Sequence, residues 1–136
     1  MARDRITFSQ LVKNEISQET SFSLERKKAL LSAYLRINGV LVFKNKETII
    51  ILNTENGKIA RFIYQTIIDM YQADVRIEYH QKSSFNKRTN YEIIVDSLGD
   101  EIIKDLDIVF FEGKISKNIV NDDDTISGYL AGAFLA

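Results

Sequence analysis

Apolar side chains recur along the chain at spacings that change several times between helical and extended patterns. In residues 24–38 and 56–71 they return every three or four positions, which predicts two amphipathic helices. Ser23 precedes the first of these helices as a capping residue. The same spacing over shorter stretches predicts two more helices, over residues 7–17 and 98–106.

Between these helices the apolar period drops to that of extended chain. The short polar segment Asn45–Glu47 and the longer polar segment Lys82–Asn90 each separate two β-rich runs, so each predicts a hairpin. The pattern therefore predicts four strands, over residues 40–44, 48–53, 75–80 and 91–95.

The predicted order, αββαββα, indicates an α+β fold in which the helices pack on one face of an antiparallel sheet. In the third strand, Arg76, Glu78 and His80 alternate with apolar residues. Such alternation is typical of a strand with one buried and one solvated face. We expect the other sheet face to be open to a partner.

Residues 107–136 are organised differently. Residues 107–125 form a connecting segment that begins with a strand-like run, Asp107–Phe111. Asp122–Asp124 is typical of a helix cap, because carboxylates favour a helix N-terminus. The helix predicted from near Thr125 is still apolar at Ala136, so we expect a longer natural protein.

Composition excludes several kinds of site. The chain has no cysteine and a single histidine, His80, which rules out thiolate chemistry and a histidine-rich zinc site within one chain. No apolar run approaches the ~20 residues that a membrane helix needs, so we expect no membrane partner and a cytoplasmic protein. Residues 1–95 hold 15 Lys and Arg against 10 Asp and Glu, whereas residues 96–136 hold 3 against 9. This asymmetry is typical of uneven surface charge or of a basic region that binds a polyanion.

The segment Leu130–Ala136 combines apolar residues with alanine and glycine, as does the earlier segment Leu31–Gly39. Small side chains let two helix backbones approach closely. A generic buried helix would have the same composition, so the pattern alone leaves both interpretations open. Where two such helices cross, the contact residues would be Ala33, Gly39, Ala131, Gly132 and Ala133.

Two such helices with an αββαββ unit between them resemble the LAGLIDADG fold of homing endonucleases. More specifically, the chain resembles the N-terminal part of the WhiA family of sporulation and cell-division regulators. The matching stretches are Phe8–Ile16, Thr54–Asn56 with Ala60–Arg61 and Ile63–Tyr64, and Tyr129–Ala136. The resemblance implies a degenerate LAGLIDADG domain whose saddle-shaped sheet binds double-stranded DNA, followed by a helix-turn-helix domain that these residues do not contain.

The resemblance also bears on catalysis. Active enzymes of this fold carry an acidic residue at the end of each motif helix, where the carboxylates hold divalent metal. Asn38 stands at the first of these positions, and the second would follow Ala136. Asn38 would thus be a lost metal ligand, although an asparagine before glycine is also an ordinary helix end. We therefore expect no catalytic residue, metal or cofactor, with an active endonuclease half as the alternative.

Basic and polar side chains on the third strand and in the two hairpins are the candidate DNA contacts. They could neutralise phosphates, although a solvated hairpin without a ligand, or a protein-interaction scaffold without DNA affinity, fits the pattern too. The candidates are Lys44, Lys46, Arg76, His80, Lys82, Lys87 and Arg88.

The resemblance divides the chain into three parts. Residues 1–106 would form the first LAGLIDADG-like half with its N-terminal helix, residues 107–125 the connection, and residues 126–136 the start of the second motif helix. An apolar helix without its own half has to be covered, so we also expect self-association of this fragment. The function expected is that of a nucleoid-associated transcriptional regulator.

Overall fold

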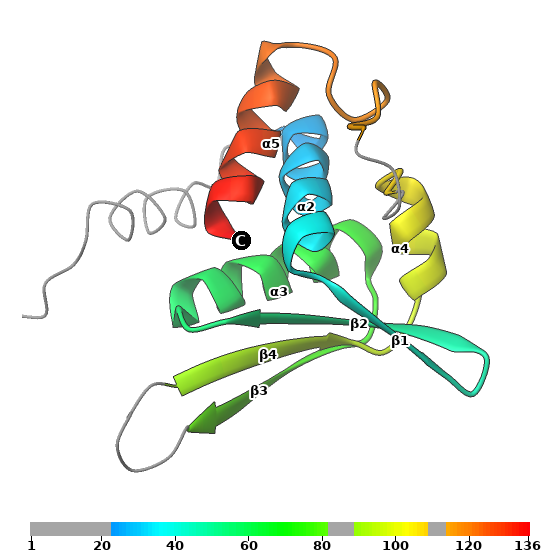
Figure 1. Cartoon of the computed structure of the whole chain (residues 1–136), viewed down its shortest axis with the longest axis vertical. Coiled ribbons are helices and arrows are strands. Elements are labelled where there is room, and N and C mark those ends of the chain that lie inside the picture. The colour runs from blue at the N-terminus through cyan, green and yellow to red at the C-terminus, as the bar shows by residue number, and fades with distance from the viewer. Residues whose placement is uncertain (1–22, 82–88, 109–113) are drawn as a thin grey trace, which may run out of the picture.

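Four strands form one antiparallel sheet in the computed structural model, which describes residues 23–81, 89–108 and 114–136. The strand order is β1-β2-β4-β3, so each hairpin contributes one central strand and one edge strand. The bounds are β1 (Val40–Lys44), β2 (Glu47–Thr54), β3 (Val75–Gln81) and β4 (Thr89–Val95). All four predicted strands are present, and the two hairpins extend in different directions beyond the helices (Figure 1).

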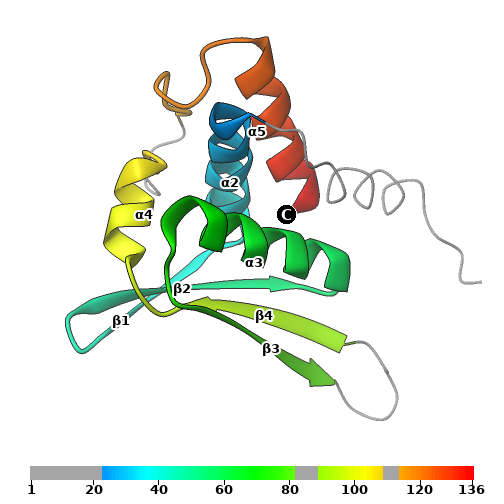
Figure 2. The same ribbon diagram turned by 180° about the vertical axis from the view of Figure 1, so that it is seen from behind.

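The described helices all lie on one side of this sheet, and the view from behind shows the same arrangement (Figure 2). α3 runs along the sheet next to β2, whereas α2 and α5 stand side by side above it. The bounds are α2 (Leu24–Asn38), α3 (Gly57–Tyr71), α4 (Gly99–Asp105) and α5 (Asp123–Leu135). The α+β prediction, with helices on one face of an antiparallel sheet, is confirmed.

The strand register separates a covered sheet face from an open one. Ile50 and Leu52 of β2 pair with Val95 and Ile93 of β4, and all four side chains are buried beneath the helices. Because side chains alternate between the two faces of a strand, the residues of opposite parity lie on the open face. The helical layer therefore rests on a fully apolar centre of the sheet.

α2 is buried along its whole middle section. Residues 29–35, seven in succession, are buried, whereas an amphipathic surface helix would bury only one face. The helix contacts α5, α3 and β2. α2 is therefore the central element of the core rather than part of its outer layer.

Local capping sets the helix boundaries. The Ser23 hydroxyl accepts a hydrogen bond from Arg26 N, and the Asn56 side chain accepts from Lys58 N and Ile59 N. Asn56, predicted as the first residue of its helix, is thus its cap. α5 begins two residues before the predicted Thr125, because Asp122 and Thr125 form a capping box.

The turn between β1 and β2 contains only Asn45 and Lys46, both with positive φ, at 53° and 64°. Two-residue turns of this kind match the twist of the flanking strands. Glu47, predicted as part of the connection, is instead the first residue of β2.

Three sequence predictions fall wholly or partly outside the described residues. The helix over residues 7–17 is one of them. Of the hairpin segment Lys82–Asn90, only Thr89 and Asn90 are described, and they belong to β4 instead of the loop. Of the strand-like run Asp107–Phe111, only Asp107 and Ile108 are described, and neither belongs to a strand.

Candidate nucleic-acid interface and the helix pair behind it

α2 and α5 are in backbone contact at two glycines of α5. A Cβ atom added to Gly132 would lie 2.0 Å from the carbonyl oxygen of Leu30, and one added to Gly128 would lie 2.4 Å from that of Arg26. Both distances are too short for a real Cβ contact. Because the contact advances four residues along each helix in the same direction, the two helices run parallel.

The five residues predicted for this contact lie in different places. Gly132 touches α2, Ala33 is fully buried in α2, and Ala131 packs against the core. Ala133 is half-buried. Gly39 lies at the end of α2, where an added Cβ would meet the Leu35 carbonyl oxygen of its own helix at 2.4 Å.

Gly128, which makes the second close approach, was not among the predicted contact residues. The sequence does carry a signal for this contact, because Gly128 and Gly132 are one helical turn apart and therefore share a face. The predicted segment of small residues begins later, at Leu130, which is 63% exposed on α5.

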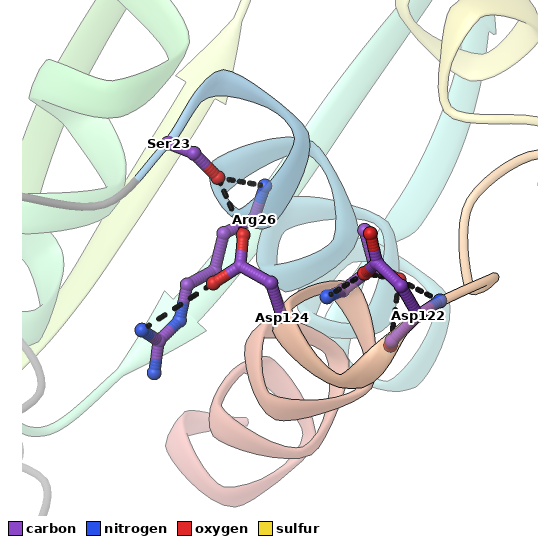
Figure 3. A network of polar contacts seen from close by, with 5 residues as sticks. Ser23, Arg26, Asp122 and Asp124 are labelled. Atoms are coloured by element: carbon purple, nitrogen blue, oxygen red, sulfur yellow. Dashed lines mark hydrogen bonds and ion pairs between the residues drawn. The ribbon is translucent and has the colours of Figure 1, made fainter.

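Polar contacts join the N-terminal ends of the two helices (Figure 3). The Ser23 hydroxyl donates to Asp124 Oδ2 at 2.7 Å, and Arg26 Nη1 lies 3.7 Å from Asp124 Oδ1. Asp122 caps α5 by accepting from Thr125 N at 2.8 Å. Hydrogen bonds from the Thr125 backbone and hydroxyl lower the pKa of Asp122 below its usual value. These polar contacts hold the N-terminal ends of α2 and α5 together.

Asn38, at the position expected for a lost metal ligand, is held by the backbone of β2. Its Nδ2 donates to the carbonyl oxygen of Asn53 at 2.9 Å, and its Oδ1 accepts from Asn53 N at 2.9 Å. An amide supplies both a donor and an acceptor, which a carboxylate cannot do when ionised. Asn38 therefore joins the end of α2 to the sheet.

The open sheet face has an apolar part and an acidic part. Val40 and Val42 of β1, with Ile49 and Ile51 of β2, occupy the apolar part, and the two valines are exposed. Glu78 of β3 and Glu92 of β4 stand opposite each other in the acidic part. The centre of this face thus offers little positive charge to a phosphate.

The DNA-contact candidates are distributed unevenly over this face. Lys44, at the end of β1, and Lys46, in the turn, are both exposed. His80 is exposed on β3, with its Nε2 3.9 Å from Glu78 Oε2. Lys82, Lys87 and Arg88 lie outside the described residues.

Arg76 lies on the open face, but two carboxylates surround its guanidinium. Its Nε donates to Asp96 Oδ2 at 2.8 Å, and its Nη1 contacts Glu78. The hydrogen bond to Asp96 is the main reason why the pKa of Arg76 is raised. Because its charge is already paired, Arg76 is a weaker phosphate ligand than an unpaired surface lysine would be.

Two further observations concern ligands and membranes. Glu78, His80 and Glu92 each offer one metal-ligating atom, and these atoms lie within 4.8 Å of one another. Of the helices that the structure describes, none has the length and apolarity needed to cross a bilayer.

Comparison with known proteins identifies the family. The sequence model of the WhiA N-terminal LAGLIDADG-like domain matches residues 24–109. A probable cell division protein WhiA of Streptococcus sanguinis (strain SK36) is 35% identical over 135 residues, which cover 96% of this chain and 43% of that protein. The probable cell division protein WhiA of Streptococcus equi subsp. zooepidemicus is 39% identical over 110 residues, covering 78% of this chain and 36% of that protein.

A solved structure agrees with the sequence comparisons. The crystal structure of the N-terminal LAGLIDADG domain of DUF199/WhiA superimposes with a TM-score of 0.66 at 19% identity, covering 99% of this chain and 60% of that one. At this identity the likeness establishes the fold alone. The chain spans less than half the length of the two curated relatives above. By the family model that covers more than half of its residues, this chain belongs to the WhiA family, as its N-terminal LAGLIDADG-like domain.

Proposed function

We propose that this chain is a non-catalytic, DNA-binding domain of a bacterial transcriptional regulator of cell division and sporulation. The observation that carries the proposal is a sheet face free of described helices and bounded by two projecting hairpins (Figure 1). Lys44 and Lys46 place two exposed cations at one of these hairpins. Double-stranded DNA would contact the hairpins with its phosphates, which gives affinity without much sequence discrimination.

The non-catalytic part of the proposal rests on Asn38. Divalent metals such as Mg²⁺ prefer charged oxygen ligands, and an asparagine amide is a poor substitute. The Asn38 amide also uses its donor and its acceptor in hydrogen bonds with the backbone of Asn53. Incubation with supercoiled plasmid and Mg²⁺ tests this: we expect no nicking, and nicking that is abolished by substituting a single acidic residue would contradict it.

A duplex titration tests DNA binding. The double substitution of Lys44 and Lys46 by alanine should weaken the affinity for a labelled duplex. The slope of the logarithm of the binding constant against the logarithm of the salt concentration should become shallower by about one unit per lost phosphate contact. Lys104→Ala with Lys117→Ala is the matched control, because these lysines are exposed in α4 and in the connection to α5. If both double variants lose the same amount of DNA affinity, the β1–β2 hairpin makes no specific contact with DNA.

A second candidate is a protein-interaction scaffold without DNA affinity. The apolar and acidic centre of the open face favours this candidate, because Val40, Val42, Glu78 and Glu92 suit a protein better than a polyanion. Titration at about 50 and 200 mM salt separates the two candidates. Binding that falls steeply with salt supports the DNA-binding domain, and absence of binding at the lower salt supports the scaffold.

The domain organisation and the cellular location belong to the same proposal. Residues 1–106 form the first LAGLIDADG-like half, residues 107–125 the connection, and residues 126–136 the start of the second motif helix. A domain of this kind would act on the nucleoid in the cytoplasm. Ile126, Leu130 and Phe134, which are apolar and exposed on α5, would favour self-association of these 136 residues.

A further inference from the structure

Three side chains with metal-ligating atoms meet on the open face of the sheet, and the proposed function gives none of them a metal-binding role. Glu78 and His80 are two residues apart on β3, so they point to the same face. Glu92 stands directly opposite Glu78 on β4. One ligand atom from each of the three lies within 4.8 Å of the other two.

Glu78 and Glu92 carry like charges at directly opposite positions, and the cation near them is Arg76, which contacts Glu78 and attracts Glu92 at longer range. Like charges that stand directly opposite on neighbouring strands repel each other. Glu92 forms no ion pair with any residue in the described part of the chain. A divalent ion between the two carboxylates would turn this repulsion into a shared contact.

Glu78 is already oriented for such a contact. Arg76 Nη1 contacts its Oε1, and Arg76 Nε is in turn held by Asp96 at 2.8 Å. The other oxygen, Oε2, lies 3.9 Å from His80 Nε2. Carboxylates that ligate a metal are commonly held by a second hydrogen bond of this kind, which fixes their direction.

We propose that Glu78, His80 and Glu92 form a binding site for a divalent transition-metal ion such as zinc. One imidazole and two carboxylates suit zinc better than magnesium, which avoids nitrogen ligands. Zinc bonds of about 2.0–2.2 Å place tetrahedral ligands roughly 3.4 Å apart, so the ligand atoms need to close by at most about 1.4 Å. The side chains of Glu78 and His80 are 41% and 58% exposed, which leaves them room to rotate and leaves the fourth zinc position open to solvent.

Calorimetric titration of the whole 136-residue chain with zinc chloride tests the site. We expect one zinc ion per chain, with affinity lowered on the order of tenfold or more in His80→Ala and in Glu92→Gln. Glu101→Gln, an exposed acid on α4, is the matched control and should bind as the parent does. Magnesium at the same concentration should give no comparable heat.

Thermal unfolding provides an independent measurement, because nonspecific binding of zinc to the surface would not distinguish the parent from Glu92→Gln. Without zinc, Glu92→Gln should differ little from the parent in stability, because it removes both the repulsion by Glu78 and the attraction by Arg76. With zinc, the parent should gain stability and the variant should not. Absence of saturable zinc binding by the parent, or zinc binding that is unchanged in His80→Ala, would overturn the proposal whatever the outcome of the DNA titrations.

Discussion

At the scale of single residues, the amide of Asn38 has a structural task that an acid could not perform. It donates to one backbone group of Asn53 and accepts from another, so it needs both halves of its amide. The end of a helix is thereby fixed to the central strand β2. The position that resembles a catalytic one is thus occupied by a residue suited to joining two elements.

Asn38→Asp should therefore destabilise the protein, by about 1–3 kcal/mol, because an ionised carboxylate would face the Asn53 carbonyl oxygen with no proton to donate. The free energy of unfolding in urea at pH 7 measures the loss. Asn38→Ala removes both hydrogen bonds without adding charge, so the difference between the variants isolates the charge. An Asn38→Asp variant as stable as the parent would show that the contact contributes nothing.

The sequence predicts which residues share a face of the sheet better than it predicts which charges meet there. Alternation along one strand correctly placed Arg76, Glu78 and His80 on a common face. It could not place Asp96, which is 20 residues away and neutralises Arg76, or Glu92, which the register sets opposite Glu78. Charge partners across strands depend on register, and register is a property of the whole sheet.

At the scale of elements, the boundaries of helices and strands followed closely from the sequence, because periodicity and caps are local signals. α2 was predicted over the same residues, 24–38, that it occupies. The close packing between α2 and α5 was less predictable, since it depends on which glycine faces the partner. Gly39 was expected there and ends its own helix instead, whereas Gly128 was overlooked.

Gly132→Ala should be destabilising by about 2–4 kcal/mol, because the added Cβ would overlap the Leu30 carbonyl oxygen and push the helices apart. Helix propensity alone predicts the opposite sign, a gain of up to about 1 kcal/mol. The sign of the change in stability, measured by thermal or urea unfolding, therefore shows whether the steric overlap or the helix propensity dominates. Ser127→Ala, on the exposed side of α5, is the control and should be neutral or slightly stabilising.

Removal of the α5 cap in Asp122→Ala should cost about 1 kcal/mol at neutral pH. Because the folded pKa of Asp122 is lowered, its contribution is fully present above the ordinary value of 3.8 and is lost as the pH falls through the folded pKa. Unfolding measured from pH 7 to pH 2 should show the difference between parent and variant shrinking only at the acid end. Asp123→Ala, which leaves the cap in place, should change stability less.

At the scale of the whole molecule, α5 has one side against α2 and another side exposed. Ile126, Leu130 and Phe134 recur at four-residue spacing on that exposed side, at 43%, 63% and 40% exposure. Exposed apolar stripes of this kind promote association between copies.

We expect the 136-residue chain to sediment as a concentration-dependent oligomer, and Leu130→Lys to shift it toward monomer. Ile115→Lys is the control, because Ile115 is also about half exposed but lies outside α5. Sedimentation equilibrium at several concentrations measures the shift. A parent chain that stays monomeric at the highest concentration would count against association through α5.

The glycine contact between α2 and α5 repeats every helical turn, and a repeating contact does not fix its own position. Sliding α5 by one turn, about 5.4 Å, would bring Gly128 to the level now occupied by Gly132 and would still leave a glycine against the α2 backbone. The bonds from Asp124 to Ser23 and Arg26 exist at only one of these steps. The polar contacts of Asp124 therefore favour one alignment of two helices whose glycine contact by itself would permit another.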